Sequence, residues 1–264
     1  RMFSSGPPPV SIELADEARQ NVPAKWTLYR NGQKVGKLTT QMKYLDGEDA
    51  FQFVYHYSEL KLDQGDVTLS ATEAVSEVKM TRGGELREQS MTGKVKLSLR
   101  GAEIAEGTIA VRAVVANGVL TGCGELKSNW GDIAGELDPV PVPKNGQPLN
   151  PLQPVNRLGG VRGGQEWVVH ESNPLQDAVA GLFRRKLAEN GLRLPDQKEK
   201  ESLVAKVGDA QQALHVKGAD VSCWVIEYRR AEPVARTWVR ASDGKVLRQE
   251  AFEKGESLTF ERED

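Results

Sequence analysis

Apolar and polar residues alternate through much of the chain between residues 25 and 137. The clearest run places four aromatic residues on one face: Phe51, Phe53, Tyr55 and Tyr57. A period of two is typical of a strand with one buried face. Dipeptides such as Asn31-Gly32 separate the runs, and they adopt the positive φ angles of tight hairpin turns. Residues 25–137 are therefore predicted to form an antiparallel β meander of seven or eight strands that curls into a half-barrel.

A convincing helical period appears in residues 173–190. The apolar residues of this stretch share one face: Leu175, Val179, Leu182, Phe183 and Leu187. Asn173 is a suitable N-cap, Pro174 suits the first helical position, and Gln176 completes a capping box. One amphipathic helix in a chain of strands implies that a curved sheet wraps around it. The predicted fold class is therefore mainly β (α+β), with a many-stranded curved antiparallel sheet or half-barrel around one helix.

Changes in composition divide the chain into four segments. These are an extended lead-in (1–24), the N-terminal meander (25–137), a Pro/Gly-rich connector (138–165), and the helix with C-terminal antiparallel strands (166–264). The prolines of the connector exclude a central strand there. Composition leaves open whether the connector separates two domains or crosses the outside of one sheet. We expect the two halves to pack as one unit.

The charge balance limits the choice of partner. The chain has 35 Lys and Arg against 37 Asp and Glu, which gives a net charge of −2. This removes the main electrostatic reason to expect nucleic-acid binding. No apolar run approaches the roughly 18 residues that a membrane helix needs, so we expect no transmembrane span.

Cysteine and histidine give little sign of redox or metal chemistry. Cys123 and Cys223 are predicted either as two buried thiols or as a disulfide that joins the two halves of the chain. His56, His170 and His215 are isolated in the sequence, and no Cys-x-x-Cys motif occurs. We therefore expect no metal site.

The usual catalytic motifs are missing from the sequence. There is no Gly-x-Ser-x-Gly elbow, no His-Glu-x-x-His motif and no Walker-type loop. The glycine-rich stretch 159–164 follows prolines rather than a strand and opens no helix, so it is predicted as a flexible linker and not as a phosphate cradle. We expect a non-enzymatic protein with no cofactor.

Three motifs stand in a recognisable order along the chain. They are W-x-L-Y-x-N-G-x-x-V-G (Trp26–Gly36), N-P-L at the helix start (Asn173–Leu175) and W-V-R-A-S-D-G-K-V-L-R-Q-E (Trp238–Glu250). In this order they resemble uncharacterised bacterial cell-envelope proteins related to the LolA/LolB lipoprotein carriers. The resemblance implies an exported protein, in the periplasm or cell envelope, whose signal peptide has been removed. It also implies a concave sheet face that can hold acyl chains, although the carriers have more helix on that face.

The leading functional hypothesis is an exported β protein that binds an apolar small molecule, such as a lipid or lipoprotein acyl chain, or an envelope protein on its concave face. The candidate residues for the lining of this cavity are Phe51, Phe53, Tyr55, Leu182, Phe183, Trp224 and Trp238. The first alternative is a scaffold or interaction module without a pocket, working through sheet edges or an exposed patch. The second is a hydrolase whose site is assembled from scattered residues.

Overall fold

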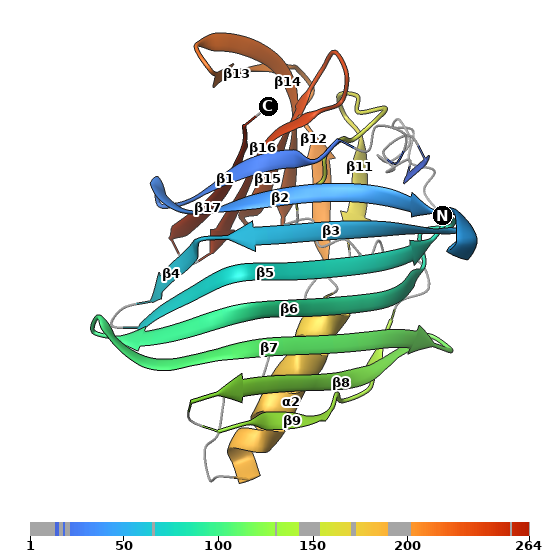
Figure 1. Ribbon diagram of the computed structural model, residues 1–264. Helices are drawn as coiled ribbons and strands as arrows, with labels where there is room; N and C mark the ends of the chain where they lie inside the picture. The colour runs from blue at the N-terminus through green and yellow to red at the C-terminus, as the bar shows by residue number, and fades with distance from the viewer. Residues whose placement is uncertain are drawn as a thin grey trace.

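The computed structural model describes residues 14–15, 18, 22–64, 67–129, 131–142, 154–169, 173–189, 202–253 and 255–263. Its strands form one open, curved, antiparallel sheet of 17 strands, with one short α-helix against it (Figure 1). The predicted fold class is confirmed. Among the described residues, no helix has both the length and the apolar character needed to cross a bilayer.

The N-terminal part of the sheet consists of long strands joined by tight turns. They are β1 (Ala24–Arg30), β2 (Gln33–Leu45), β3 (Ala50–Ser58), β4 (Leu60–Gln64), β5 (Val67–Thr81), β6 (Leu86–Leu99), β7 (Ala102–Ala116), β8 (Val119–Ser128) and β9 (Ile133–Glu136). A 3-10 turn, η1 (Asp46–Glu48), links β2 to β3. The meander therefore has nine strands, one more than the upper limit of the prediction, because β4 and β9 are too short to show a clear period.

The C-terminal part follows a two-residue strand, β10 (Val140–Pro141), that pairs with β8. Its elements are β11 (Glu166–Val169), α2 (Pro174–Glu189), β12 (Leu203–Val207), β13 (Gln212–Val216), β14 (Ala219–Arg229), β15 (Pro233–Arg240), β16 (Val246–Glu253) and β17 (Glu256–Arg262). Strands β12 and β13 both pair with β14, which also pairs with β15.

The two halves meet at β1, the first strand of the sheet. On one side β1 pairs with β2, and on the other side it pairs with β17, the last strand. The Thr27 hydroxyl also donates a hydrogen bond to the Glu263 carboxylate at 2.7 Å. One continuous ladder thus joins both ends of the described chain.

Local sequence accounts well for the turns and for the start of the helix. Asn31 and Gly32 have φ angles of 48° and 77°, as a tight hairpin turn requires. At the helix start, the Gln176 backbone N–H donates to the Asn173 Oδ1, and the Asn173 side-chain amide donates to Gln176 Oε1. The predicted N-cap is confirmed. The loop between β2 and β3 contains a similar dipeptide, Asp46-Gly47, but the left-handed residue there is Asp49, with φ of 45°.

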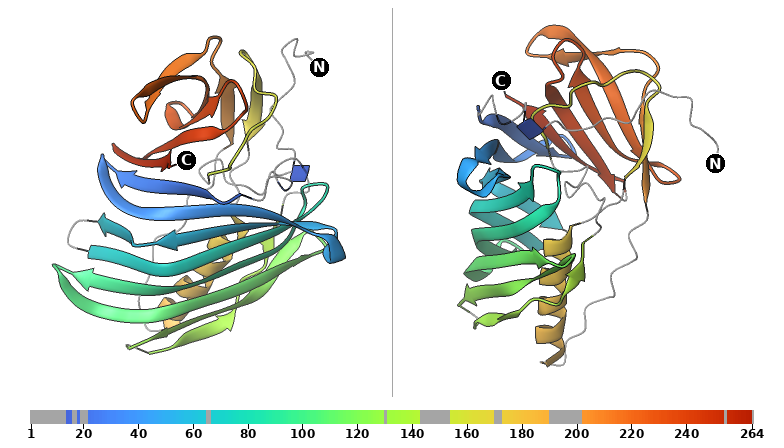
Figure 2. Two further views of the ribbon diagram at one scale, coloured as in Figure 1. Left: turned by 45° about the horizontal axis from the view of Figure 1, so that its top comes forward. Right: turned by 90° about the vertical axis from the view of Figure 1, so that its right-hand side faces the viewer.

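The sheet bends so that its two halves face each other across a shared core (Figure 2). The inward residues of β2 and β3 belong to the same buried cluster as Ile226 on β14 and Val239 on β15. Helix α2 contacts β8, β9 and β10 at one end of the concave face. The C-terminal strands cover the rest of that face, whereas the sequence predicts that the helix alone covers it.

The end of the connector is more ordered than its composition suggests. Arg157 forms a β-bridge with Lys245. The side chain of Gln165 is buried, accepts a hydrogen bond from the Arg162 N–H at 2.6 Å, and donates one to the Gly160 carbonyl at 3.3 Å. The turn thus folds around the Gln165 amide and satisfies its hydrogen bonds, whereas composition alone predicts a flexible linker at 159–164.

Candidate functional site

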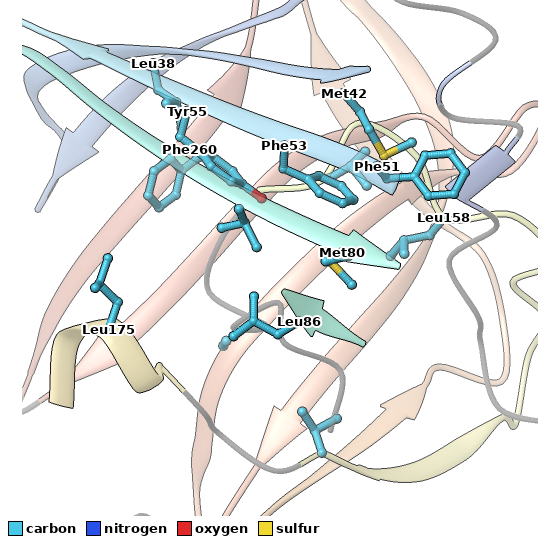
Figure 3. Packing of buried hydrophobic residues seen from close by; sticks show 14 of the residues in the cluster. Leu38, Met42, Phe51, Phe53, Tyr55, Met80, Leu86, Leu158, Leu175 and Phe260 are labelled. Carbon is cyan, nitrogen blue, oxygen red and sulfur yellow. The ribbon is translucent and has the colours of Figure 1, made fainter. Parts of the chain in front are cut away.

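The aromatic residues predicted to line a cavity on the concave face lie in a packed core. Phe51, Phe53 and Tyr55 point inward from β3 and are 2%, 7% and 1% exposed, and Leu182 of α2 is 2% exposed. They belong to one continuous cluster that also contains Leu38, Met80 and Phe260 (Figure 3). Exposed fractions this low leave almost no room for water beside these side chains. Side chains of the chain itself therefore occupy the space next to Phe51 and Tyr55.

The other predicted lining residues, Trp224, Trp238 and Phe183, do not all lie there. Trp224 packs partly against the main cluster. Trp238 alternates to the opposite, outer face of β15 and packs against a second small cluster with Leu214 and Leu247. The side chain of Phe183 lies outside the described residues. Placing Trp238 on the concave face is wrong, because this strand has apolar residues on both faces and its pattern does not distinguish them.

The tyrosine hydroxyls of the interior are not set up for acid–base chemistry. Burial raises the pKa of Tyr55 far above its ordinary range, and burial raises the pKa of Tyr57 and Tyr228 to about 12 each. All three are therefore neutral near pH 7. Within the described residues, the Tyr55 hydroxyl has no hydrogen-bond partner, so no base is positioned to activate it.

The cysteines form no disulfide. Cys123 is exposed on β8, whereas Cys223 is buried on β14, and both are free thiols. The predicted bridge is therefore wrong, and so is the expectation that both thiols are buried. Burial raises the pKa of Cys223, which disfavours the reactive thiolate. Among the described residues, no three His, Cys, Asp or Glu side chains come together as metal ligands.

The first candidate for a binding site is the outer edge of the sheet at β11. The Val207 N–H donates to the Gln165 carbonyl, which sets the alternation of the β11–β12 ladder. In this alternation the backbone groups of Trp167 bond to β12, whereas those of Glu166 and Val168 point away from it. Among the described strands, β11 pairs with β12 alone, and β10, the strand before it in the chain, pairs with β8.

Apolar side chains lie beside this open edge. Val168 is 58% exposed, and its cross-strand partner Val204 on β12 is 40% exposed. Both lie on the outer face of the sheet, because Trp167 and Ala205 point into the core. The open edge, defined here as Glu166–Val169 with Val204, therefore combines unpaired backbone groups with an exposed apolar pair.

The second candidate is a polar hollow on the same outer face, called the outer hollow below. It has a volume of about 500 Å³ and is lined by Lys206, Gly208, Asp209, Gln212, Val225, Glu227, Arg229, Arg236 and Trp238. This volume lies within the range of small-molecule sites. The cross-strand pairs Lys206–Glu227, Glu227–Arg236 and Val225–Trp238 form its floor.

Glu227 is at the centre of the charges in the outer hollow. Its carboxylate accepts hydrogen bonds from Nε of Arg229 and from Nε of Arg236. Partial burial acts to raise the pKa of Glu227, but the hydrogen bonds and charges of the two arginines hold it below its ordinary value. The carboxylate is therefore ionised over the physiological pH range and holds both guanidinium groups over the floor.

A glycine turn from the connector packs against one side of the outer hollow. A Cβ on Gly163 would lie 2.8 Å from the Asp209 carbonyl oxygen and 3.2 Å from the Trp224 ring. Glycine is thus needed for this close approach. Neither candidate site is predicted by the sequence pattern. The charge alternation Glu227, Arg229 and Arg236 was the available signal for the hollow, but it is equally typical of a solvated strand face.

No family model, no curated protein and no solved structure matches this chain.

Proposed function

We propose that this protein is a non-enzymatic interaction module that binds an extended segment of a partner protein at the open edge. The partner segment adds as a further strand beside β11 and bonds to the outward backbone groups of Glu166 and Val168. The observation that carries this proposal is an unpaired edge strand flanked by an exposed valine pair. The export of the protein to the cell envelope stays a prediction.

The packed interior favours this proposal over an apolar-ligand carrier. A carrier needs a space on the concave face, whereas the residues predicted to line one are buried within a continuous cluster. Edge strands of stable proteins are usually blunted by lysine, proline, a bulge or a cover, because an open edge recruits other strands. Strand β11 (EWVV) contains no lysine and no proline.

The side chains of the open edge indicate which residues a partner segment should carry. Strand β11 has two side chains on the outer face of the sheet, Glu166 and Val168. A paired strand places its own side chains directly opposite them, where opposite charges and apolar contacts are favourable. We therefore propose a partner segment that carries an apolar β-branched residue opposite Val168 and a lysine or arginine opposite Glu166.

A labelled peptide tests this proposal directly. The probe is a fluorescein-labelled octapeptide, Thr-Val-Thr-Lys-Thr-Val-Thr-Lys, which places valine and lysine in turn on one face of the added strand. It is compared with the same peptide N-methylated at its central amides. The expected result is saturable binding of the first peptide and at least a tenfold loss for the second, because N-methylation removes the edge hydrogen bonds. Fluorescence anisotropy measures both.

Two protein variants complete the experiment. Val168→Lys places a charge on the open edge and should abolish binding. Val114→Lys is the matched control, because Val114 is an exposed valine of β7, 46% exposed and far from the edge in sheet order. Equal binding of the two peptides, or binding that survives Val168→Lys, would contradict the proposal.

A further inference from the structure

The outer hollow has more cationic groups than its own carboxylates use. Lys206, Arg229 and Arg236 face two carboxylates, Glu227 and Asp209. Glu227 engages both arginines through Nε alone. Within the described part of the chain, no residue accepts a hydrogen bond from their terminal amino groups, and none forms an ion pair with Lys206. These groups are therefore available to a bound anion.

A buried donor in the floor adds to this excess. The indole N–H of Trp238 is buried and has no acceptor among the described residues. Unpaired N–H dipoles leave a positive potential around them. An anion above the floor is favoured by this potential as well as by the three side-chain cations.

One side of the outer hollow is apolar. The rings of Trp238 and the side chain of Val225 are cross-strand neighbours on the floor, next to the cationic residues. An indole ring favours stacking with a flat group. A guanidinium group, in turn, matches the planar or tetrahedral oxygens of carboxylates and phosphates with paired N–H donors.

We propose that the outer hollow is a binding site for a small oxyanion that carries a planar apolar group. The carboxylate or phosphate lies between Arg229, Arg236 and Lys206, and the planar group lies against Trp238. The site uses residues of β12, β14 and β15, and it does not depend on strand addition at β11. Failure of the peptide experiment therefore leaves this proposal intact, and the reverse also holds.

Titration of ¹⁵N-labelled full-length protein tests the site. The probes are phenyl phosphate and benzoate, with inorganic phosphate and benzamide as matched controls that lack the ring or the charge. The expected result is saturable shifts of the Trp238 indole and Gly208 amide resonances with at least one aromatic anion. The protein should bind that anion at least about tenfold more tightly than it binds either control.

Variants establish which groups hold the anion. Arg236→Gln and Lys206→Gln should each weaken binding by about tenfold. Lys206 is exposed and has no ion pair with a described residue, so its replacement leaves the fold intact. Arg112→Gln is the control, because Arg112 also donates from Nε to a carboxylate, that of Glu88 at 2.8 Å, but on β7.

The same titrations contain the results that would overturn the proposal. These are no saturable shift with either aromatic anion, equal affinity for benzamide or inorganic phosphate, or unchanged affinity in both Arg236→Gln and Lys206→Gln. Weakening by Arg112→Gln to the same degree would also overturn it, because the effect would then be one of net charge rather than of the outer hollow.

Discussion

The two ends of the sheet differ in how their edges are protected. At one end, β8 is bordered by β9 and β10, two short strands separated by the sequence Leu137–Pro139. Pro139 and Pro141 remove backbone donors from this edge, and α2 packs against the same strands. At the other end, β11 has neither prolines nor a covering helix among the described residues. We call the first the closed edge.

This difference indicates how one sheet can block strand pairing at one edge and leave it open at the other. Prolines and a packed helix suppress further strand pairing at the closed edge. The open edge retains its donors and acceptors and exposes two valines. The proposed function therefore depends on one edge only, and each edge can be altered without rebuilding the other.

The largest expected effect comes from breaking the closed edge. Leu182 packs over Gly124 of β8, where an added Cβ would lie 3.1 Å from the leucine Cδ2. Leu182→Ala should lower the free energy of unfolding by about 2–5 kcal/mol, because it removes apolar contact and leaves a cavity. Chemical denaturation measures this change. Val114→Ala, at an exposed site, is the control and should cost less than about 0.5 kcal/mol.

A smaller loss is expected where the connector is fastened to the sheet before it reaches β11. The buried Thr40 hydroxyl accepts from the Trp26 indole N–H and donates to Asn156 Oδ1 at 2.5 Å. Asn156→Ala leaves this hydroxyl without an acceptor and should cost about 1–3 kcal/mol. Asn129→Ala, which removes an exposed hydrogen bond to the Glu106 N–H, should cost less. Equal costs would show that Asn156 does not fasten the connector.

Low pH should lower the stability of the region where the connector meets the sheet. The group responsible is Asp243, in the β15–β16 turn. Hydrogen bonds from Arg240 and the Lys245 N–H, with the charges of Arg240 and Arg157, lower the pKa of Asp243 from 3.8 to about 2 although burial opposes them. The stabilisation is present above the unfolded-state pKa and is lost as the pH falls through the folded-state value.

Asp243→Asn isolates this contribution. The difference in unfolding free energy between wild type and variant should be constant above about pH 5 and should shrink as the pH falls toward about 2. Denaturation curves across this range measure it. A difference that stays constant to the lowest pH would show that the Asp243 carboxylate adds no acid-sensitive stability.

The smallest effect on stability is expected at the open edge itself. Val168 is 58% exposed, so Val168→Lys should change the free energy of unfolding by no more than about 0.5 kcal/mol. The same substitution should abolish peptide binding. A large loss of stability in denaturation experiments would instead mean that Val168 supports the fold, and the open edge would lose its interpretation as a binding surface.

Features set by neighbouring residues could be predicted from the sequence. The Asn173–Gln176 cap, the Asn31-Gly32 turn and the inward face of β3 all follow from patterns within a few positions. The pairing of β1 with β17 could not be predicted, because it joins residues more than two hundred positions apart through general backbone hydrogen bonds. The cover of the concave face by the C-terminal strands was missed for the same reason.

The candidate sites could not be predicted from local sequence patterns, for a different reason. Trp238 and Ile226 both look like core residues in the sequence, and only the pairing of β14 with β15 shows that they face opposite sides. Likewise, Val168 belongs to a short apolar run that is typical of any strand. Its exposure follows from the position of β11 at the end of the sheet.

Hydrogen exchange at the open edge is the most direct test of the central claim. In the free protein the amides of Glu166 and Val168 should exchange rapidly, and those of Trp167 and Val169 slowly. Addition of the valine–lysine peptide should protect Glu166 and Val168 and leave the closed edge unchanged. Slow exchange at Glu166 and Val168 in the free protein, or no added protection with the peptide, would contradict strand addition at β11.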